Sequence, residues 1–118
     1  NDFERLLAET GTTILKFYLH ISKDEQKKRL EERRDTPHKQ WKFQSGDLAV
    51  RAHWDDYMEA YEAALSATST EHAPWHVIPA NSKLARNLMV STLLVEALED
   101  LKMRYPEAEP GVAAVQIE

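Results

Sequence analysis

The sequence predicts an α/β fold, mostly helical, with two strands that contribute to a parallel sheet. Residues 12–21 form an almost continuous run of β-branched, aromatic and aliphatic residues, which is typical of a strand buried on both faces. Residues 75–79 form a second short strand after two helical stretches, and strands separated in this way pair in parallel. A two-stranded sheet is too small to bury both faces, so we expect these 118 residues to be the C-terminal part of a larger sheet.

The first half of the chain predicts a helix, a strand and a second helix. Residues 2–10 predict a short helix that Gly11 ends, because glycine adopts the conformation required after a helix at little cost. After the first strand, Ser22 and Glu25 have the spacing of a capping box that begins a charged helix. Pro37 ends that helix, since proline disfavours the helical conformation in the residue before it.

The second half predicts two longer helices. Ser45 is placed to cap a helix over residues 46–67, after a polar loop at 36–44. One apolar stripe follows this helix, formed by Val50, Trp54, Tyr57, Met58, Tyr61 and Leu65. A last helix covers residues 83–104, and residues 107–118 form a flexible tail. The expected buried side of the last helix consists of Leu84, Leu88, Thr92, Val95, Leu98 and Leu101.

Composition excludes several classes of protein. With 42% hydrophobic and 30% charged residues, the chain is globular rather than disordered. The absence of Cys removes disulfide scaffolds and thiolate zinc sites, and the five His have no metal-ligand spacing. The three Gly cannot form a Gly-rich phosphate loop. No apolar run approaches the ~18 residues that span a bilayer, and no secretory leader opens the chain, so we expect a cytoplasmic protein.

Charge is distributed unevenly along the chain. Residues 23–42, the basic segment, hold eight Lys or Arg against five Asp or Glu, whereas the other 98 residues hold seven against fifteen. A nucleic-acid binder would be basic over a whole face, so no nucleic-acid partner is expected. One basic segment suits a compact polyanion held at one place, although a solvated helix of mixed charge accounts for the same residues.

The candidate binding residues lie in the basic segment. Arg29 and Arg33 are one helical turn apart, and Lys39 and Lys42 follow in the loop after Pro37. Cations that converge from a helix end and a loop hold phosphates, with Arg giving forked contacts and Lys a point charge. Positioning and charge stabilisation are most of what a protein contributes to phosphoryl transfer.

Several long motifs resemble the family-2 polyphosphate kinases. They are FYLHISKDEQ at 17–26, ER at 32–33, PHKQWKF at 37–43, AHWDDYMEAY at 52–61, TST at 68–70 and APWHVIPA at 73–80. The resemblance covers residues 1–106, nearly the whole chain. The form of the motif at 52–58 is closest to the class that accepts both AMP and ADP.

The resemblance implies a thymidylate-kinase-like P-loop kinase with a three-layer parallel sheet, of which this chain is the C-terminal, lid-bearing part. Such enzymes move phosphoryl groups between polyphosphate and AMP, ADP or ATP with magnesium. The resemblance also implies a homo-oligomeric parent enzyme without a membrane partner. The lid segment, residues 23–45, would bring Arg29, Arg33, Lys39 and Lys42 to the phosphates.

The resemblance also implies what this chain lacks. The family's Walker A and Walker B motifs would lie upstream of residue 1, and the missing initiator Met agrees with a start inside a longer protein. We therefore expect no catalytic residue and no metal ligand in this chain, and no activity from it alone.

Two other functions fit the sequence. The chain could be a non-catalytic helical module that binds a polyanion or an acidic partner through its basic helix. It could also be part of a conventional nucleotide kinase that uses ATP as donor. A Gly-rich loop encoded upstream would favour either kinase over the non-catalytic module. Dependence on polyphosphate would then distinguish a polyphosphate kinase from a conventional nucleotide kinase.

Overall fold

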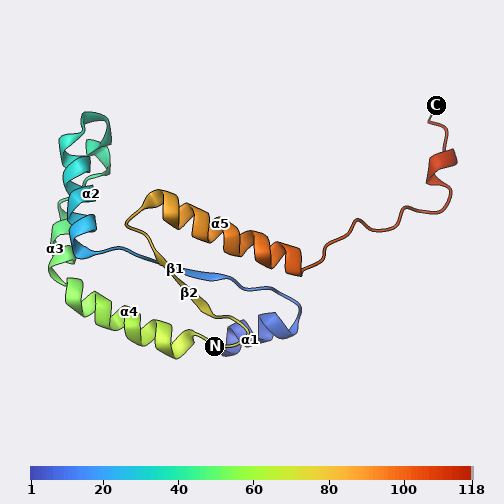
Figure 1. Cartoon of the computed structure of the whole chain (residues 1–118), viewed down its shortest axis with the longest axis horizontal. Helices are drawn as coiled ribbons and strands as arrows, with labels where there is room; N and C mark the ends of the chain where they lie inside the picture. The colour runs from blue at the N-terminus through green and yellow to red at the C-terminus, as the bar shows by residue number, and fades with distance from the viewer. Residues whose placement is uncertain (118) are drawn as a thin grey trace.

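A two-stranded parallel sheet lies at the centre of the fold in the computed structural model, which describes residues 1–117 (Figure 1). Strand β1 (Lys16–His20) pairs with β2 (Trp75–Pro79) in parallel, with the first residues of the two strands opposite each other. The predicted parallel pairing is confirmed. β1 is shorter than the predicted run at 12–21, because it pairs only where β2 runs beside it.

Helices form most of the remaining chain. In chain order they are α1 (Asp2–Glu9), α2 (Lys23–Asp35), the 3₁₀ helix η1 (Pro37–Lys42), α3 (Gly46–Ala52), α4 (Trp54–Thr68), α5 (Lys83–Asp100) and the 3₁₀ helix η2 (Val112–Ala114). Helices α4 and α5 lie on opposite sides of the strands in Figure 1. α5 packs against β2, and the ring of Tyr61 in α4 lies 5.1 Å from that of Tyr18 in β1.

The predicted helix ends are only partly correct. Gly11 follows α1 with a φ of 91°, as expected for a glycine after a helix. Ser22 caps α2, since its Oγ accepts the Glu25 N–H at 3.1 Å. The carboxylate of Glu25 instead accepts from Arg29 at 2.7 Å, so the reciprocal half of the capping box is absent.

The single helix predicted over residues 46–67 is wrong, because His53 divides it into α3 and α4. His53 has φ −93° and ψ 27°, outside the helical region. Asp55 and Asp56 lie in the first turn of α4, where the positive end of the helix dipole stabilises carboxylates and favours a new helix start. Ser45 makes no capping bond, contrary to the prediction, since its own backbone is already helical.

The predicted loop at 36–44 contains η1, which begins at Pro37. Proline suits the first turn of such a helix, because its φ is fixed near the helical value and no amide donor is lost there. The tail contains η2, and residues 107–117 are exposed. Glu118, the last residue of the predicted tail, lies outside the described residues.

The predicted buried side of α5 is wrong. Leu84, Leu88 and Leu98 are exposed by 82%, 66% and 44%, whereas Val90 and Leu93 are half-buried. α5 carries apolar residues around much of its circumference, so contact with β2, rather than periodicity, decides which side is covered.

Little of the chain is fully buried. The buried apolar residues among those described are Leu30, Ala73, Ile78 and Ala80. β1 is not covered on both faces by residues 1–117, because Leu19 is 47% exposed. Trp54, a member of the predicted apolar stripe, is half-buried, with the guanidinium of Arg51 5.9 Å from its ring centre. Within residues 1–117, no helix has the length and hydrophobicity that crossing a bilayer requires.

Candidate functional site

Helices α2, η1 and α3 form one structure, called the projection, that extends from the carboxyl end of β1 (Figure 1). The backbone enters it from β1 through Ser22 and leaves it through His53 into α4. The projection contains the whole basic segment. In open α/β sheets, ligands bind outside the carboxyl ends of the strands, so the basic segment begins at the edge where a ligand is expected.

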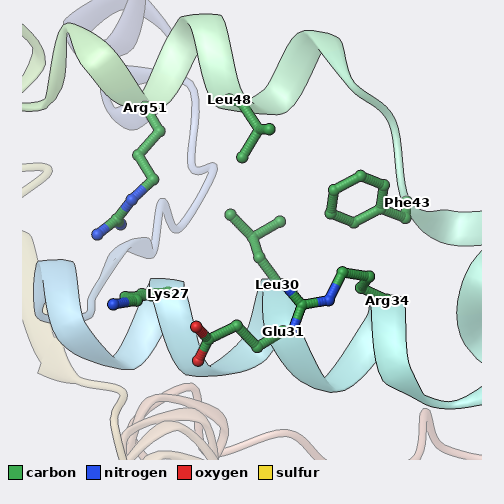
Figure 2. A pocket seen from close by; sticks show the side chains of 7 residues that line it. All are labelled: Lys27, Leu30, Glu31, Arg34, Phe43, Leu48 and Arg51. Atoms are coloured by element: carbon green, nitrogen blue, oxygen red, sulfur yellow. The ribbon is translucent and has the colours of Figure 1, made fainter.

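The side chains of α2 and α3 enclose two clefts in the projection, and buried Leu30 lines both. The first cleft, about 280 Å³, is lined by Lys27, Leu30, Glu31, Arg34, Phe43, Leu48 and Arg51. Figure 2 shows Leu30 of α2 pointing toward Leu48 and Phe43, with the long charged side chains around this apolar centre. The second cleft, about 340 Å³, is lined by Ile21, Gln26, Arg29, Leu30, Arg33, Asp47 and Val50.

The structure brings Arg29 and Arg33 together and places Lys39 and Lys42 apart from them. The two arginines line the second cleft. Lys39 and Lys42 lie on η1, where Lys39 forms an ion pair with Glu32 of α2. The Nζ of Lys42 lies 5.0 Å from the ring centre of Trp41, which is 78% exposed.

The two arginines of the second cleft differ in how their donors are used. Arg29 Nε donates to Glu25 at 2.7 Å, and its Nη2 donates to the carbonyl oxygens of Ala80 at 2.7 Å and Asn81 at 3.2 Å. Arg33 is exposed and has no hydrogen-bond or ion-pair partner within residues 1–117. Arg33 can therefore offer its whole guanidinium fork to an anion.

Positive charge surrounds the carboxylate at the tip of α2. The Lys39 ammonium, hydrogen-bonded to Glu32, holds the pKa of that carboxyl below its ordinary value, and Lys83 and Lys28 act in the same direction from farther away. Arg34 pairs with Asp35 at 2.7 Å and lowers the pKa of the aspartate carboxyl.

The described residues do not form a metal site. No three His, Cys, Asp or Glu side chains in residues 1–117 lie together in a way that could hold a metal ion. The described residues therefore offer no ligand set for the magnesium that the resemblance implies.

Three structural contacts at or near the sheet were not predicted. Arg51 donates to the carbonyl of Lys23 at 2.8 Å and to the Gln26 side chain at 2.7 Å, which ties α3 to the start of α2. Asn81 bonds Ser22 across the ends of the strands. Lys16, only 9% exposed, donates to Glu4 and to the Thr68 carbonyl. The position of Lys16 at the start of an apolar strand could have identified it as a buried, paired lysine. No local pattern identifies the partners of Arg51 or Asn81.

Comparison with known proteins gives consistent matches. The model of the polyphosphate kinase 2 family matches residues 1–106. The AMP/ADP-polyphosphate phosphotransferase of Meiothermus ruber is 61% identical over 99% of this chain, a match that covers 44% of that protein. The ADP-polyphosphate phosphotransferase of Rhodopseudomonas palustris is 51% identical over 93% of this chain and 38% of its own length.

A solved structure agrees with these relatives. The crystal structure of polyphosphate kinase 2 from Arthrobacter aurescens TC1 superimposes with a TM-score of 0.93 at 58% identity, over 97% of this chain and 41% of that one. The chain spans less than half the length of these two curated relatives. The matched family model, the relatives and the shared fold together show that this chain belongs to the polyphosphate kinase 2 family.

Proposed function

We propose that this chain is the lid-bearing part of an enzyme that moves phosphoryl groups between polyphosphate and AMP or ADP. The observation that carries the proposal is the basic projection at the carboxyl end of β1, with Arg33 free to bind an anion. The names of the Meiothermus ruber and Rhodopseudomonas palustris relatives support polyphosphate and AMP or ADP as substrates. The 61% identity to the relative named for both acceptors favours the use of both.

The two parallel strands are proposed to belong to the three-layer sheet of a P-loop kinase similar to thymidylate kinase. The half-exposed Leu19 and Val77 support this, since both lie on strands that a larger sheet and its helices would cover. Magnesium, with ligands outside this chain, and a homo-oligomeric whole enzyme are part of the same proposal.

The projection would act on phosphate by charge and position. In phosphoryl transfer the transferred group carries spread negative charge, so cations that meet it in the transition state lower the barrier. Arg33 would supply a forked contact, and Lys39 and Lys42 would supply point charges from η1. Arg29 lines the same cleft as Arg33, but its Nε and Nη2 already donate to protein acceptors.

The proposal is tested with the full-length protein that contains this chain. Purified protein is mixed with magnesium, long-chain polyphosphate and either AMP or ADP, and the formation of ADP and ATP is measured. A parallel reaction replaces polyphosphate with ATP as donor to AMP. We expect transfer that requires polyphosphate and that uses both AMP and ADP.

Two results would overturn the proposal. Transfer from ATP to AMP without any dependence on polyphosphate would identify a conventional nucleotide kinase. Tight binding of polyphosphate with no transfer to either nucleotide would identify a non-catalytic polyanion-binding module.

A further inference from the structure

We infer that Arg29 is a positioning residue that fastens the base of the projection to the carboxyl end of the sheet, and is not a ligand of the transferred phosphates. The inference rests on the proposed function, because the reaction that Arg29 would support is phosphoryl transfer. It differs from the expectation drawn from the sequence, which placed Arg29 beside Arg33 among the phosphate-binding residues.

The guanidinium of Arg29 donates to protein acceptors through its Nε and Nη2 atoms. Its Nε donates to Glu25 one turn earlier in α2, and its Nη2 donates to the carbonyl oxygens of Ala80 and Asn81, 51 and 52 residues away in the chain. The side chains of Arg29 and Glu25 are only 21% and 19% exposed. Because these bonds involve a charged donor and little solvent, replacing them with a bound phosphate would cost more than recruiting the exposed Arg33.

The acceptors of Arg29 are part of the rigid sheet end. Ala80 is 1% exposed, and its N–H donates to the His20 carbonyl at 2.7 Å, which continues the pairing of β1 and β2 by one bond. Arg29 therefore connects the second turn of α2 to the backbone that follows β2.

A second connection lies beside the first. Asn81 accepts the Ser22 N–H through its Oδ1 at 2.9 Å and donates through its Nδ2 to the Ser22 Oγ at 3.2 Å. The same Oγ caps α2 by accepting the Glu25 N–H. Asn81 and Arg29 thus hold α2 at its N-cap and at its second turn, and we call these contacts the α2 latch.

The α2 latch divides the projection into a fixed base and a tip. Arg33 lies one turn beyond Arg29, and Lys39 and Lys42 lie beyond Arg33, so the proposed phosphate ligands all follow the last latched residue. With the α2 latch intact, the base of α2 is fixed and Arg33 keeps one position. Without it, α2 would adopt many orientations, and the position of Arg33 would vary with them. Loss of the latch should therefore reduce the fraction of molecules ready to react, and lower kcat more than it weakens polyphosphate binding.

The experiment compares Arg29→Lys and Asn81→Ala in the full-length protein, with Lys28→Ala as the control. Lys28 is exposed on the same helix and has no hydrogen-bond or ion-pair partner in residues 1–117. Amide hydrogen exchange is measured over residues 23–30 without any ligand, followed by steady-state kinetics with polyphosphate.

We expect exchange over residues 23–30 to rise by about tenfold in Arg29→Lys and Asn81→Ala, and to stay unchanged in Lys28→Ala. We also expect kcat to fall about tenfold in Arg29→Lys while the KM for polyphosphate stays within about twofold. Glu25→Gln should add little to the kcat loss of Arg29→Lys, since both changes break one set of contacts.

The opposite pattern would overturn the inference. If ligand-free exchange is unchanged in Arg29→Lys while the KM for polyphosphate rises, Arg29 is a phosphate ligand. If Arg29→Lys fails to fold, Asn81→Ala and Glu25→Gln decide the question through the same exchange measurement. Absence of polyphosphate-dependent transfer by the unmodified protein would refute the proposed function, whereas the ligand-free exchange would still decide whether the latch exists.

Discussion

Single side chains in the basic segment have different roles because their surroundings differ. Arg29 and Arg33 are one helical turn apart, yet one is held by protein acceptors and the other is exposed. Lys39 is paired with Glu32, and Lys42 lies over Trp41. Spacing along α2 predicted that the arginines share a face. Two of the three acceptors of Arg29 are carbonyl groups in the loop after β2, and no local sequence pattern indicates that contact.

Arg33 should act through the geometry of its guanidinium as well as through its charge. Arg33→Lys keeps the charge and loses the fork, so we expect a slower chemical step, by about tenfold if roughly 1.4 kcal/mol of transition-state contact is lost. Single-turnover kinetics of the full-length protein measure this step. A lysine variant that reacts as fast as the unmodified protein would show that Arg33 makes no forked contact.

Lys39 and Lys42 should act as point charges that salt can screen. We expect Lys39→Ala and Lys42→Ala to weaken polyphosphate use at low ionic strength, and added salt to narrow their difference from the unmodified protein. Steady-state rates at two ionic strengths measure this, with Lys28→Ala as a control for general loss of charge. A defect that does not change with salt would contradict the point-charge role.

Lys16 should stabilise the contact of β1 with α1 and α4. Its ammonium lies 2.7 Å from Glu4 and 2.6 Å from the Thr68 carbonyl, and the side chain is nearly buried. Lys16→Met leaves that carbonyl without its donor, so we expect the free energy of unfolding to fall by about 1–3 kcal/mol. Urea denaturation of the full-length protein measures the change. If Lys16→Met and the exposed control Lys28→Met have equal free energies of unfolding, the stabilising role of Lys16 is contradicted.

At the scale of elements, one ion pair connects η1 to α2. Only Thr36 separates α2 from η1, which begins at Pro37, and Lys39 of η1 reaches back to Glu32 of α2. Lys39 lowers the pKa of the Glu32 carboxyl. A lowered pKa in the folded protein means that the contact is fully present above the unfolded pKa and is lost as pH falls through the folded value.

Acid should therefore break the ion pair between Lys39 of η1 and Glu32 of α2. The ordinary pKa of the Glu32 carboxyl is 4.5, so we expect the pair to persist above that pH and to break only below it. The titration of the Glu32 carboxyl carbon, followed by NMR in the full-length protein, gives the folded pKa. Lys39→Met should shift the midpoint back upward, and equal midpoints in the two proteins would show that the pair does not form in solution.

The whole molecule exposes more surface than a compact domain of its size. The accessible area is 9794 Å², whereas a monomer of 13.6 kDa would expose roughly 6,600 Å². The Cα radius of gyration is 21.9 Å, against about 13.5 Å for a compact chain of 118 residues. Much of the exposed surface is apolar. It includes side chains of α5, Leu19 of β1 and Val77 of β2.

The isolated 118-residue chain should therefore neither unfold cooperatively nor transfer phosphate. Too little apolar surface is buried to offset the conformational entropy lost on folding, and no Gly-rich phosphate loop is present. Calorimetry should show no sharp transition, and an assay with polyphosphate, ADP and magnesium should show no ATP. A sharp transition would contradict the structural part of this prediction, and turnover would contradict the functional part.

The sequence by itself determined the helix–strand order, the parallel pairing, the Ser22 cap and the family. These depend on local signals: an apolar run at 12–21, a hydroxyl before a charged helix, and long ordered motifs. Only the tertiary structure decided which side of α5 is covered and where the helix after Ser45 breaks. It also decided which of Arg29 and Arg33 is hydrogen-bonded to the protein. α5 is apolar on several sides, so its contact with β2 selects the covered one. Arg29 bonds carbonyl groups about 50 residues away, and such distant backbone acceptors leave no pattern in the sequence.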